Sequence, residues 1–347
     1  MKMNRLGQTD IMVSALCLGS MTWGTQNTQD EGHAQIDMAL DHGVNFIDTA
    51  EMYPVNPISA ERIGNSERII GEWVAKSGRR DDVVIATKVS GANGGFVREG
   101  RGFDGPTILE TVDQSLERLQ TDVIDLYQLH WPNRGSYMFR QNWTYDPSSQ
   151  NKAETLAHMD DVLRAMQQVV EAGKVRAFGL SNESAWGTAQ WLRISEDAGL
   201  PRVASIQNEY SLLCRLYDTD LAELSVNEDV GLLAFSPLAT GLLSRKYTKG
   251  KVPEGSRMAI NANLGGRVTE HVWPAIAAYE AIADKYDLDI NQMALAWCLT
   301  RPFMCSAIFG ATKMEQLDVI LKTQDITLSD EVLEDIDTAH RAHPMPY

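Results

Sequence analysis

Cysteines and long apolar runs are both scarce in this sequence. The cysteines show no C-x-x-C pair and no other spacing typical of a disulfide framework or a zinc site; the four are Cys17, Cys214, Cys298 and Cys305. No apolar run approaches the ~20 residues that span a bilayer, and the basic residues near the start precede no apolar segment. We therefore expect a cytoplasmic protein with reduced thiols, no transmembrane helix and no signal peptide.

Positive charge is also in short supply. The 31 basic residues face 47 acidic ones, so the formal net charge is −16. Phosphate would repel such a chain, so neither nucleic acid nor an anionic membrane is expected as a partner. The hydrophobic content of 44% and the charged content of 22% are those of a globular protein and argue against disorder. No linker or change in composition divides the chain, so we expect one domain over residues 1–347.

Eight short apolar runs recur along the chain, each followed by a longer stretch. They cover residues 15–19, 44–48, 83–87, 123–129, 175–180, 203–207, 230–235 and 306–310. Most are apolar throughout, which is typical of parallel strands buried on both faces. The first run continues as LGSMTWG, which lacks the glycines of a dinucleotide fingerprint and the lysine of a P-loop. The pattern therefore favours an α/β protein of the closed (β/α)8 TIM barrel type over a doubly wound sheet.

Helical spacing fills most of the intervals between these runs. Ser66 is expected to cap a helix that stops at Gly78, and Pro106 is expected at the first position of the next helix. Further helices are expected at 156–172, 184–198, 271–285, 291–301, 314–322 and 329–341. Residues 2–14 indicate a hairpin that could plug the bottom of the barrel. The aperiodic segments 89–105 and 131–152 follow strand ends, where long loops are often functional.

Polar side chains stand where several of the apolar runs end. Asp48 ends the second run, Lys88 and His130 directly follow the third and fourth, and Gln207 ends the sixth. Each alone has an ordinary explanation as a helix cap, a solvated lysine or a packed histidine. In a barrel, however, these strand ends converge on one face. We therefore expect the four side chains to belong to one site.

A proton donor for this site is Tyr53, five residues after Asp48. A free phenol has a pKa of about 10, which is too high for easy proton release near neutrality. A neighbouring cation stabilises the tyrosinate, so we expect Lys88, held by Asp48, to lower the pKa of Tyr53. Tyr53 would then act as a general acid, and His130 would donate a hydrogen bond to a substrate oxygen.

The later strand ends offer groups that suit a nicotinamide cofactor. Ser181, Asn182 and Gln207 can recognise an amide, and Phe235 offers an aromatic face for stacking. The small-residue loop 236–243 can cradle a pyrophosphate with its backbone N–H groups. We therefore expect a bound nicotinamide to supply a hydride.

Cations follow this loop in an otherwise acidic chain. Arg245, Lys246 and Arg257 could serve a phosphate, although for any one of them alone a solvated loop is the favoured explanation. Residues 310–313, GATK, precede an expected helix and could bind an anion at its N-terminus.

Seven segments, in this order, resemble motifs of the aldo-keto reductase superfamily. They are GVNFIDTAEMY (43–53), ATK (86–88), LYQLHWP (126–132), GLSN (179–182), IQNEYSLL (206–213), AFSPLATGLLSRKY (234–247) and FGATKMEQL (309–317). The stretches EMYPV and LHWPNR are most similar to the bacterial Tas-type branch, which is related to potassium-channel β-subunits. The resemblance implies a (β/α)8 barrel and metal-free, NADPH-dependent reduction of a small aldehyde or ketone.

The resemblance also implies a role for individual residues. Tyr53 would be the proton donor, Lys88 and Asp48 would lower its pKa, and His130 would orient the carbonyl. The implied site for NADPH or NADP+ consists of Asp48, Met21, Thr22, Trp23, Ser181, Asn182, Gln207, Phe235, Ser236, Pro237, Leu238, Thr240, Gly241, Leu242, Lys246, Arg257, Gly310, Thr312, Lys313 and Gln316.

One stretch departs from the resemblance. Relatives carry an adenine-contacting asparagine after GATKMEQL, whereas this chain has Val319 and Ile320. The departure leaves the choice between NADPH and NADH open, and Lys313 is expected to compensate through the 2′-phosphate.

Two other functions stay open beside the reductase. One is a slow enzyme that senses bound NADPH and regulates a partner. Channel β-subunits differ at the position of His130, so the histidine favours an active reductase. The other is a lyase that forms a Schiff base at Lys88, which a neighbouring Asp48 would oppose by keeping the lysine charged. Aromatic residues in 131–152 are either loop packing or a lid suited to aromatic aldehydes. The oligomeric state stays open.

Overall fold

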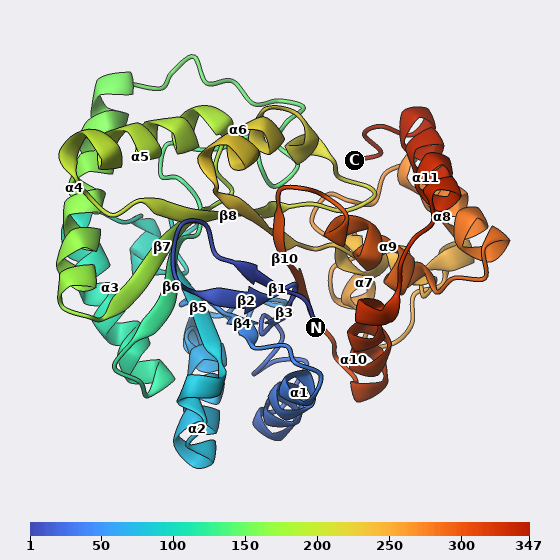
Figure 1. Ribbon diagram of the computed structural model, residues 1–347, viewed down its shortest axis with the longest axis horizontal. Helices are drawn as coiled ribbons and strands as arrows, with labels where there is room; N and C mark the ends of the chain where they lie inside the picture. The colour runs from blue at the N-terminus through green and yellow to red at the C-terminus, as the bar shows by residue number, and fades with distance from the viewer.

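Eight parallel strands close into a barrel in the computed structural model, which describes residues 1–347 (Figure 1). The strands pair in the order β10-β3-β4-β5-β6-β7-β8-β9. Their bounds are β3 (Leu16–Gly19), β4 (Phe46–Asp48), β5 (Val84–Val89), β6 (Ile124–Leu129), β7 (Val175–Ser181), β8 (Val203–Glu209), β9 (Gly231–Phe235) and β10 (Met304–Phe309). Each predicted apolar run overlaps one of these strands, so the predicted (β/α)8 barrel is confirmed.

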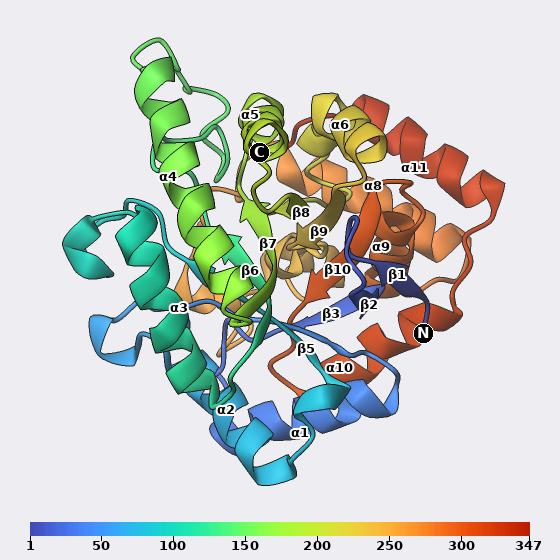
Figure 2. The same ribbon diagram turned by 60° about the vertical axis from the view of Figure 1, so that its left-hand side comes forward.

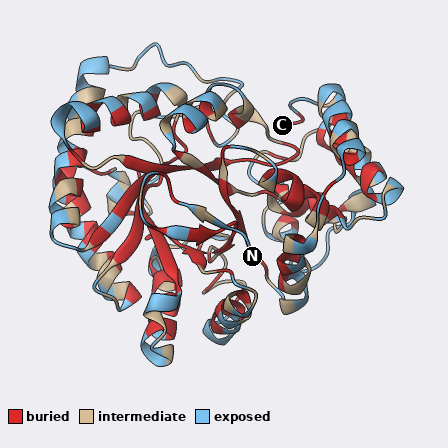
Figure 3. Ribbon diagram, viewed as in Figure 1, coloured by how far each residue is buried: buried red, intermediate tan, exposed pale blue.

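Helices surround the barrel, as the second view shows (Figure 2). They are α1 (Gln29–Asp41), α2 (Asn65–Ser77), α3 (Gly105–Leu119), α4 (Lys152–Glu171), α5 (Ala185–Ala198), α6 (Asp220–Glu228), α7 (Arg257–Ile260), α8 (Val272–Lys285), α9 (Ile290–Leu299), α10 (Met314–Leu321) and α11 (Asp330–Ala342). The barrel strands are largely buried, whereas the outer helix faces are exposed (Figure 3). Three helices were not predicted, namely α1, α6 and α7. None of the helices combines the length and apolar character needed to cross a lipid bilayer.

The residues predicted to begin α2 and α3 do not hold the predicted positions. Ser66 does not cap α2, because Gly64 occupies the cap position and the Ser66 hydroxyl donates to the carbonyl oxygens of Ser20 and Trp23. These two bonds fasten α2 to the loop after β3. At α3 the Asp104 carboxylate accepts from the backbone N–H of Thr107, so that helix begins at residue 105, one position before the predicted start.

A hairpin closes the N-terminal end of the barrel, as predicted. Strands β1 (Met3–Arg5) and β2 (Met12–Ser14) pair in antiparallel fashion. Their connection and its flanks place Leu6, Ile11 and Val13 in a buried cluster with barrel residues that include Phe46. Gly7 has a φ of +55°, and a Cβ there would lie 2.4 Å from the carbonyl oxygen of Ala204. Only glycine therefore lets the turn lie this close to β8.

The two long inserts lie at the opposite, C-terminal end of the strands, one after β5 and one after β6. They are joined by hydrogen bonds: the Trp131 indole donates to the carbonyl oxygen of Ala92 at 2.8 Å, and the Asn133 amide donates to that of Phe103 at 2.7 Å. Gly102 packs so closely that a Cβ would lie 2.0 Å from Asn133 Oδ1. The two inserts are thus packed against each other at the C-terminal end of the barrel.

Candidate active site

A buried ion pair lies between neighbouring strands at the mouth of the barrel. Asp48 is the last residue of β4, and Lys88 is the fifth residue of β5. Lys88 Nζ donates to Asp48 Oδ2 at 2.6 Å and to the carbonyl oxygen of Thr49 at 2.7 Å. The lysine side chain is fully buried. Burial opposes its charge, but the attraction of Asp48 and Tyr53 outweighs that effect and raises the pKa of Lys88. The lysine is therefore a fixed cation.

Tyr53 lies above this pair in the loop after β4. Lys88 Nζ is 5.0 Å from the centroid of the Tyr53 ring. Burial raises the pKa of Tyr53 above its ordinary value; Lys88 opposes that rise, Asp48 adds to it and Arg257 opposes it. The net direction is opposite to our expectation, because burial outweighs the cation. The phenol consequently keeps its proton at neutral pH, and Lys88 stabilises the anion formed when the proton leaves.

His130 completes the group directly after β6. Its ring centroid is 5.8 Å from that of Tyr53, with an edge-to-face angle of 74°. Burial and the charge of Lys88 hold the pKa of His130 well below its usual range, so the imidazole is neutral at pH 7. Its Nδ1 is buried without a hydrogen-bond partner. The structure thus brings together the four residues predicted as catalytic, with a protonated phenol beside a neutral imidazole.

Two glutamines bind the Asp48 carboxylate: Gln207, which was predicted, and Gln128, which sequence reasoning missed. Gln207 lies inside β8, and its amide donates to Asp48 Oδ1 at 2.8 Å and to Gln128 Oε1 at 3.1 Å. The Gln128 amide in turn donates to Asp48 Oδ1 at 3.3 Å. Side chains alternate along a strand, so Gln128 shares the inward face with His130, two residues later. That spacing is the signal by which it could have been found.

Ser181 is the last residue of β7, and Asn182 directly follows it beside this network. The Ser181 hydroxyl donates to the carbonyl oxygen of Gln207 at 2.8 Å, and the Asn182 amide donates to that of His130 at 2.9 Å. Asn182 Oδ1 is buried and accepts no hydrogen bond. Such an unpaired acceptor is costly unless a ligand donates to it. A carboxamide NH2 supplies that donor, so the residues present fit the nicotinamide that we expected.

The loop after β9 has an unusual backbone. Phe235 is the half-buried last residue of β9, and the chain then takes positive φ values at Ser236, Thr240 and Gly241. Left-handed residues of this kind turn N–H groups into a concave surface that suits an anion. A Cβ on Gly241 would lie 2.3 Å from Cε of Lys246. Glycine therefore lets the lysine lie directly against the loop.

Two cations near this loop have no carboxylate partner. Lys246 and Arg257 make no salt bridge and no side-chain hydrogen bond, and Arg257 Nε is buried. Burial lowers the pKa of Lys246, and Arg257 lowers it further. Burial, with repulsion from Arg267, lowers the pKa of Arg257 to about 10. Arg245 differs, because it pairs with Asp284 at 2.6 Å on the exposed side. Two unpaired, partly desolvated cations in so acidic a protein are chemically suited to bind a phosphate group.

Several of the other predicted cofactor residues lie after β10, and one, Trp23, lies after β3. Thr312 donates from its backbone N–H to Gln316 Oε1 at 3.0 Å, and the exposed Lys313 beside them makes no ion pair. Ile320, in place of the expected asparagine, is packed into the core with 4% exposure. Trp23 is fully buried, and its indole donates to Gln35. The Trp23 side chain therefore packs between the barrel and its helices, and its contact with the cofactor stays a prediction.

The other predicted residues of this site lie at strand ends and in the loops of the same face. Met21 accepts from the N–H of Val55, and the Thr22 hydroxyl donates to Asn27. The rest are in the loop after β9 or directly after β10; they are Pro237, Leu238, Leu242 and Gly310.

A buried carboxylate at the end of β8 holds two arginines. Glu209 accepts from Arg267 Nε at 2.7 Å and from Arg140 at 2.8 Å, and the Tyr347 hydroxyl donates to it at 3.3 Å. Sequence reasoning missed this group, because its members come from four distant segments. It ties the insert after β6 to the segment after β9 at the mouth of the barrel.

The aromatic residues of the second insert are not equivalent. Trp131 is half-buried, with its ring 4.7 Å from His130 and 6.0 Å from Phe139. Tyr137 and Tyr145 pack against each other at 6.1 Å. Trp143 points outward, with 64% of its surface exposed. Of the candidate lid residues, Trp131 is therefore the one placed against the site.

Comparison with known proteins agrees with this geometry. Residues 15–341 match the model of the aldo/keto reductase family. The chain is similar to Protein tas of Escherichia coli, at 40% identity over 100% of this chain and 99% of the relative. It is 31% identical to a probable voltage-gated potassium channel subunit beta of Arabidopsis thaliana, over 99% and 98% of the two chains. It is also 32% identical to the uncharacterized oxidoreductase YrpG of Bacillus subtilis, over 96% and 94%.

Proposed function

The chain belongs to the aldo/keto reductase family, and from that premise we propose that it reduces the carbonyl group of aldehydes or ketones with NADPH. The observation that carries the proposal is the Lys88–Asp48 ion pair, buried beneath a protonated Tyr53 with neutral His130 beside it. This arrangement can give a proton to a developing alkoxide and stabilise the phenolate that remains. Carbonyl reduction requires both proton donation and stabilisation of the phenolate from the protein side chains.

Each residue has a separate task in this reaction. The nicotinamide, when bound, supplies the hydride for the carbonyl carbon. Tyr53 donates its proton to the carbonyl oxygen, and Lys88 stabilises the resulting tyrosinate. Asp48 holds the lysine in place and charged, and neutral His130 donates a hydrogen bond that orients the carbonyl oxygen. Asn182 and Ser181 hold the carboxamide, while Lys246 and Arg257 supply charge for the cofactor phosphates.

We further propose that the enzyme prefers NADPH to NADH and accepts aromatic aldehydes. Unpaired Lys246 and Arg257 support the preference, because each suits the extra 2′-phosphate. Exposed Lys313 is placed to add a third charge, so Lys313→Ala should weaken NADPH binding. Unchanged NADPH affinity in that variant would remove Lys313 from the site. Trp131 supports the substrate class, since its ring lies against His130 and offers an apolar face.

The proposal is tested by NADPH oxidation with an aromatic aldehyde, measured for the purified protein and for Tyr53→Phe. We expect turnover in the wild type, and turnover reduced by at least about 100-fold in the variant while NADPH still binds. Turnover retained by Tyr53→Phe would contradict the assignment of the proton donor. Absence of wild-type turnover across an aldehyde panel, despite tight NADPH binding, would contradict the reductase.

That last outcome would support a second function, a slow NADPH-binding sensor that regulates a partner. The similarity to a probable potassium channel subunit favours keeping this alternative. A Schiff-base lyase has less support, because the raised pKa of Lys88 keeps its amine protonated and unable to attack a carbonyl carbon. Borohydride trapping with carbonyl compounds should accordingly leave Lys88 unmodified.

A further inference from the structure

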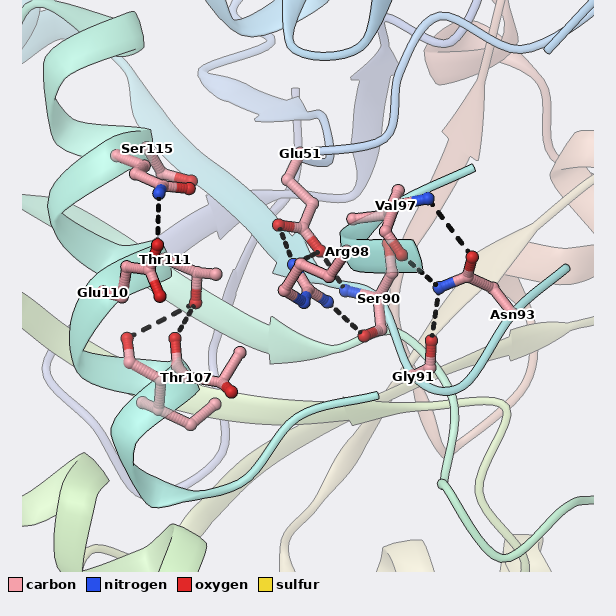
Figure 4. Close-up of polar contacts among 12 residues, drawn as sticks. Glu51, Ser90, Gly91, Asn93, Val97, Arg98, Thr107, Glu110, Thr111 and Ser115 are labelled. Atoms are coloured by element: carbon pink, nitrogen blue, oxygen red, sulfur yellow. Dashed lines mark hydrogen bonds and ion pairs between the residues drawn. The ribbon is translucent and has the colours of Figure 1, made fainter. Parts of the chain in front are cut away.

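A second buried ion pair lies in the loop that carries the proton donor. Glu51, two residues before Tyr53, is 3% exposed. Arg98, from the insert after β5, donates from one nitrogen to both carboxylate oxygens of Glu51, at 2.8 and 2.7 Å (Figure 4). The two residues are 47 positions apart in the sequence. This ion pair therefore links the insert after β5 to the loop after β4.

The ion pair of Glu51 and Arg98 also binds the backbone of Ser90, directly after the strand that carries Lys88. Glu51 Oε1 accepts from the backbone N–H of Ser90 at 2.5 Å, and Arg98 donates to the carbonyl oxygen of Ser90 at 2.7 Å. The backbone N–H of Glu51 donates to the carbonyl oxygen of Lys88 at 3.1 Å. Both polar backbone groups of Ser90 are thus held by one ion pair. Glu51 and Arg98 link the Tyr53 loop to the end of β5.

The backbone at Arg98 has an unfavourable conformation, which the surrounding contacts hold in place. Arg98 and Glu99 have φ values of +46° and +55°, a region that side chains other than glycine rarely adopt. Asn93 braces the turn, since its amide donates to Gly91 and Val97 (Figure 4). Val97 packs against Ala50 and Met52 in a small cluster that Tyr53 borders. The insert therefore supports the Tyr53 loop through apolar contact as well as charge.

We propose that Arg98 is a positioning residue for proton transfer, which holds Tyr53 over Lys88 through Glu51 and Ser90. The proposal deepens the reductase function and rests on it. Two effects follow from loss of the guanidinium. The Tyr53 loop loses its tie to the insert, and a buried carboxylate is left without a counter-charge beside the proton donor. We expect little change in cofactor binding, because most residues that would hold the cofactor lie on strands β7 to β10 and their loops, and neither Glu51 nor Arg98 makes a side-chain hydrogen bond to Met21, Thr22 or Asp48.

The test compares Arg98→Gln with Arg101→Gln in the full-length protein. Arg101 is an exposed arginine of the same insert that makes no ion pair, so it is a matched control. The first measurement is the single-turnover rate of NADPH oxidation, with the NADPH dissociation constant determined separately. The second is amide hydrogen exchange of residues 49–55 without substrate. Circular dichroism melting checks that each variant is folded, and Arg98→Lys replaces Arg98→Gln if the latter unfolds.

We expect Arg98→Gln to slow the single-turnover rate at least about tenfold, with NADPH affinity within about twofold of wild type. Exchange in residues 49–55 should accelerate in this variant and not in Arg101→Gln. The double variant with Glu51→Gln should lose less rate than the product of the two single losses, because it removes the unpaired carboxylate as well.

Three results would overturn the proposal. They are an unchanged single-turnover rate in Arg98→Gln, a slowed rate without faster exchange in 49–55, and independent effects of the Glu51 and Arg98 substitutions. Absence of turnover in the wild type is a different failure, since it rejects the reductase itself. The exchange measurement still decides in that case whether Arg98 holds the Tyr53 loop.

Discussion

Replacement of Lys88 by methionine tests how strongly the lysine charge stabilises the Tyr53 phenolate. Lys88 Nζ lies 5.0 Å from the centroid of the Tyr53 ring. At an effective dielectric constant of about 20, a unit charge and a phenolate about 5 Å apart attract each other by about 3 kcal/mol. That energy corresponds to about 2 pKa units, since one unit is about 1.4 kcal/mol. We expect Lys88→Met to raise the pKa of Tyr53 by this amount.

The consequence for catalysis follows from the direction of the shift. A phenol with a higher pKa is a weaker acid, so the plateau of kcat should fall by about 10- to 100-fold. Tyr53 must be protonated to act, so the alkaline limb of the pH profile should move to higher pH. Asp48 keeps its bonds from Gln207 and Gln128, so the change is confined to charge and to the space left by the ammonium group.

The assay is the pH dependence of kcat for aldehyde reduction in the wild type, Lys88→Met and Lys322→Met. Lys322 pairs with Asp318 on the outer surface with 56% of its side chain exposed, so its loss should change nothing. An unchanged plateau in Lys88→Met, or an alkaline limb that moves to lower pH, would refute the reasoning. NADPH affinity should stay within about threefold of wild type, because Lys88 is not among the residues expected to hold the cofactor.

Three further predictions follow from the geometry. Trp131→Ala should raise the KM for benzaldehyde several-fold, whereas exposed Trp143→Ala should leave it unchanged; equal effects would contradict the placement of Trp131 at the site. Because neutral His130 has a pKa well below its usual range, kcat should show no histidine ionisation between about pH 6 and 8, and an inflection there that is lost in His130→Gln would be inconsistent. Gly71→Ala places a Cβ 2.2 Å from the carbonyl oxygen of Arg118 and should destabilise by about 1–3 kcal/mol in urea titration, with Gly94→Ala unaffected.

Burial on both faces made the strands of this barrel readable from the sequence. A strand such as 84–89 is apolar through most of its length, and its boundary moved by only one or two residues. Helix α1 was missed because its buried face includes His33 and Gln35, so no apolar stripe marks it. Helix α6 buries only Leu221 and Ser225 and leaves little periodic signal.

The site was predictable to the extent that it depends on strand ends. Asp48, Lys88 and His130 each follow or end a buried run, and parallel strands bring such positions together. The pair of Glu51 and Arg98 could not be predicted, because nothing local indicates a contact between residues 47 positions apart. The pKa of Tyr53 was assigned the wrong net direction, because the sequence shows the neighbouring cation but not the depth of burial.

The bonds between the two inserts have a consequence for evolution and for engineering. Ala92 and Phe103 in the first insert are held by Trp131 and Asn133 in the second, and Gly102 leaves no room between them. If the first insert alone were replaced, the Trp131 indole and the Asn133 amide of the second insert would lose their hydrogen-bond acceptors. We therefore expect the two segments to be exchangeable only as a unit, and a library that diversifies the entrance of this barrel should vary them jointly on an unaltered scaffold.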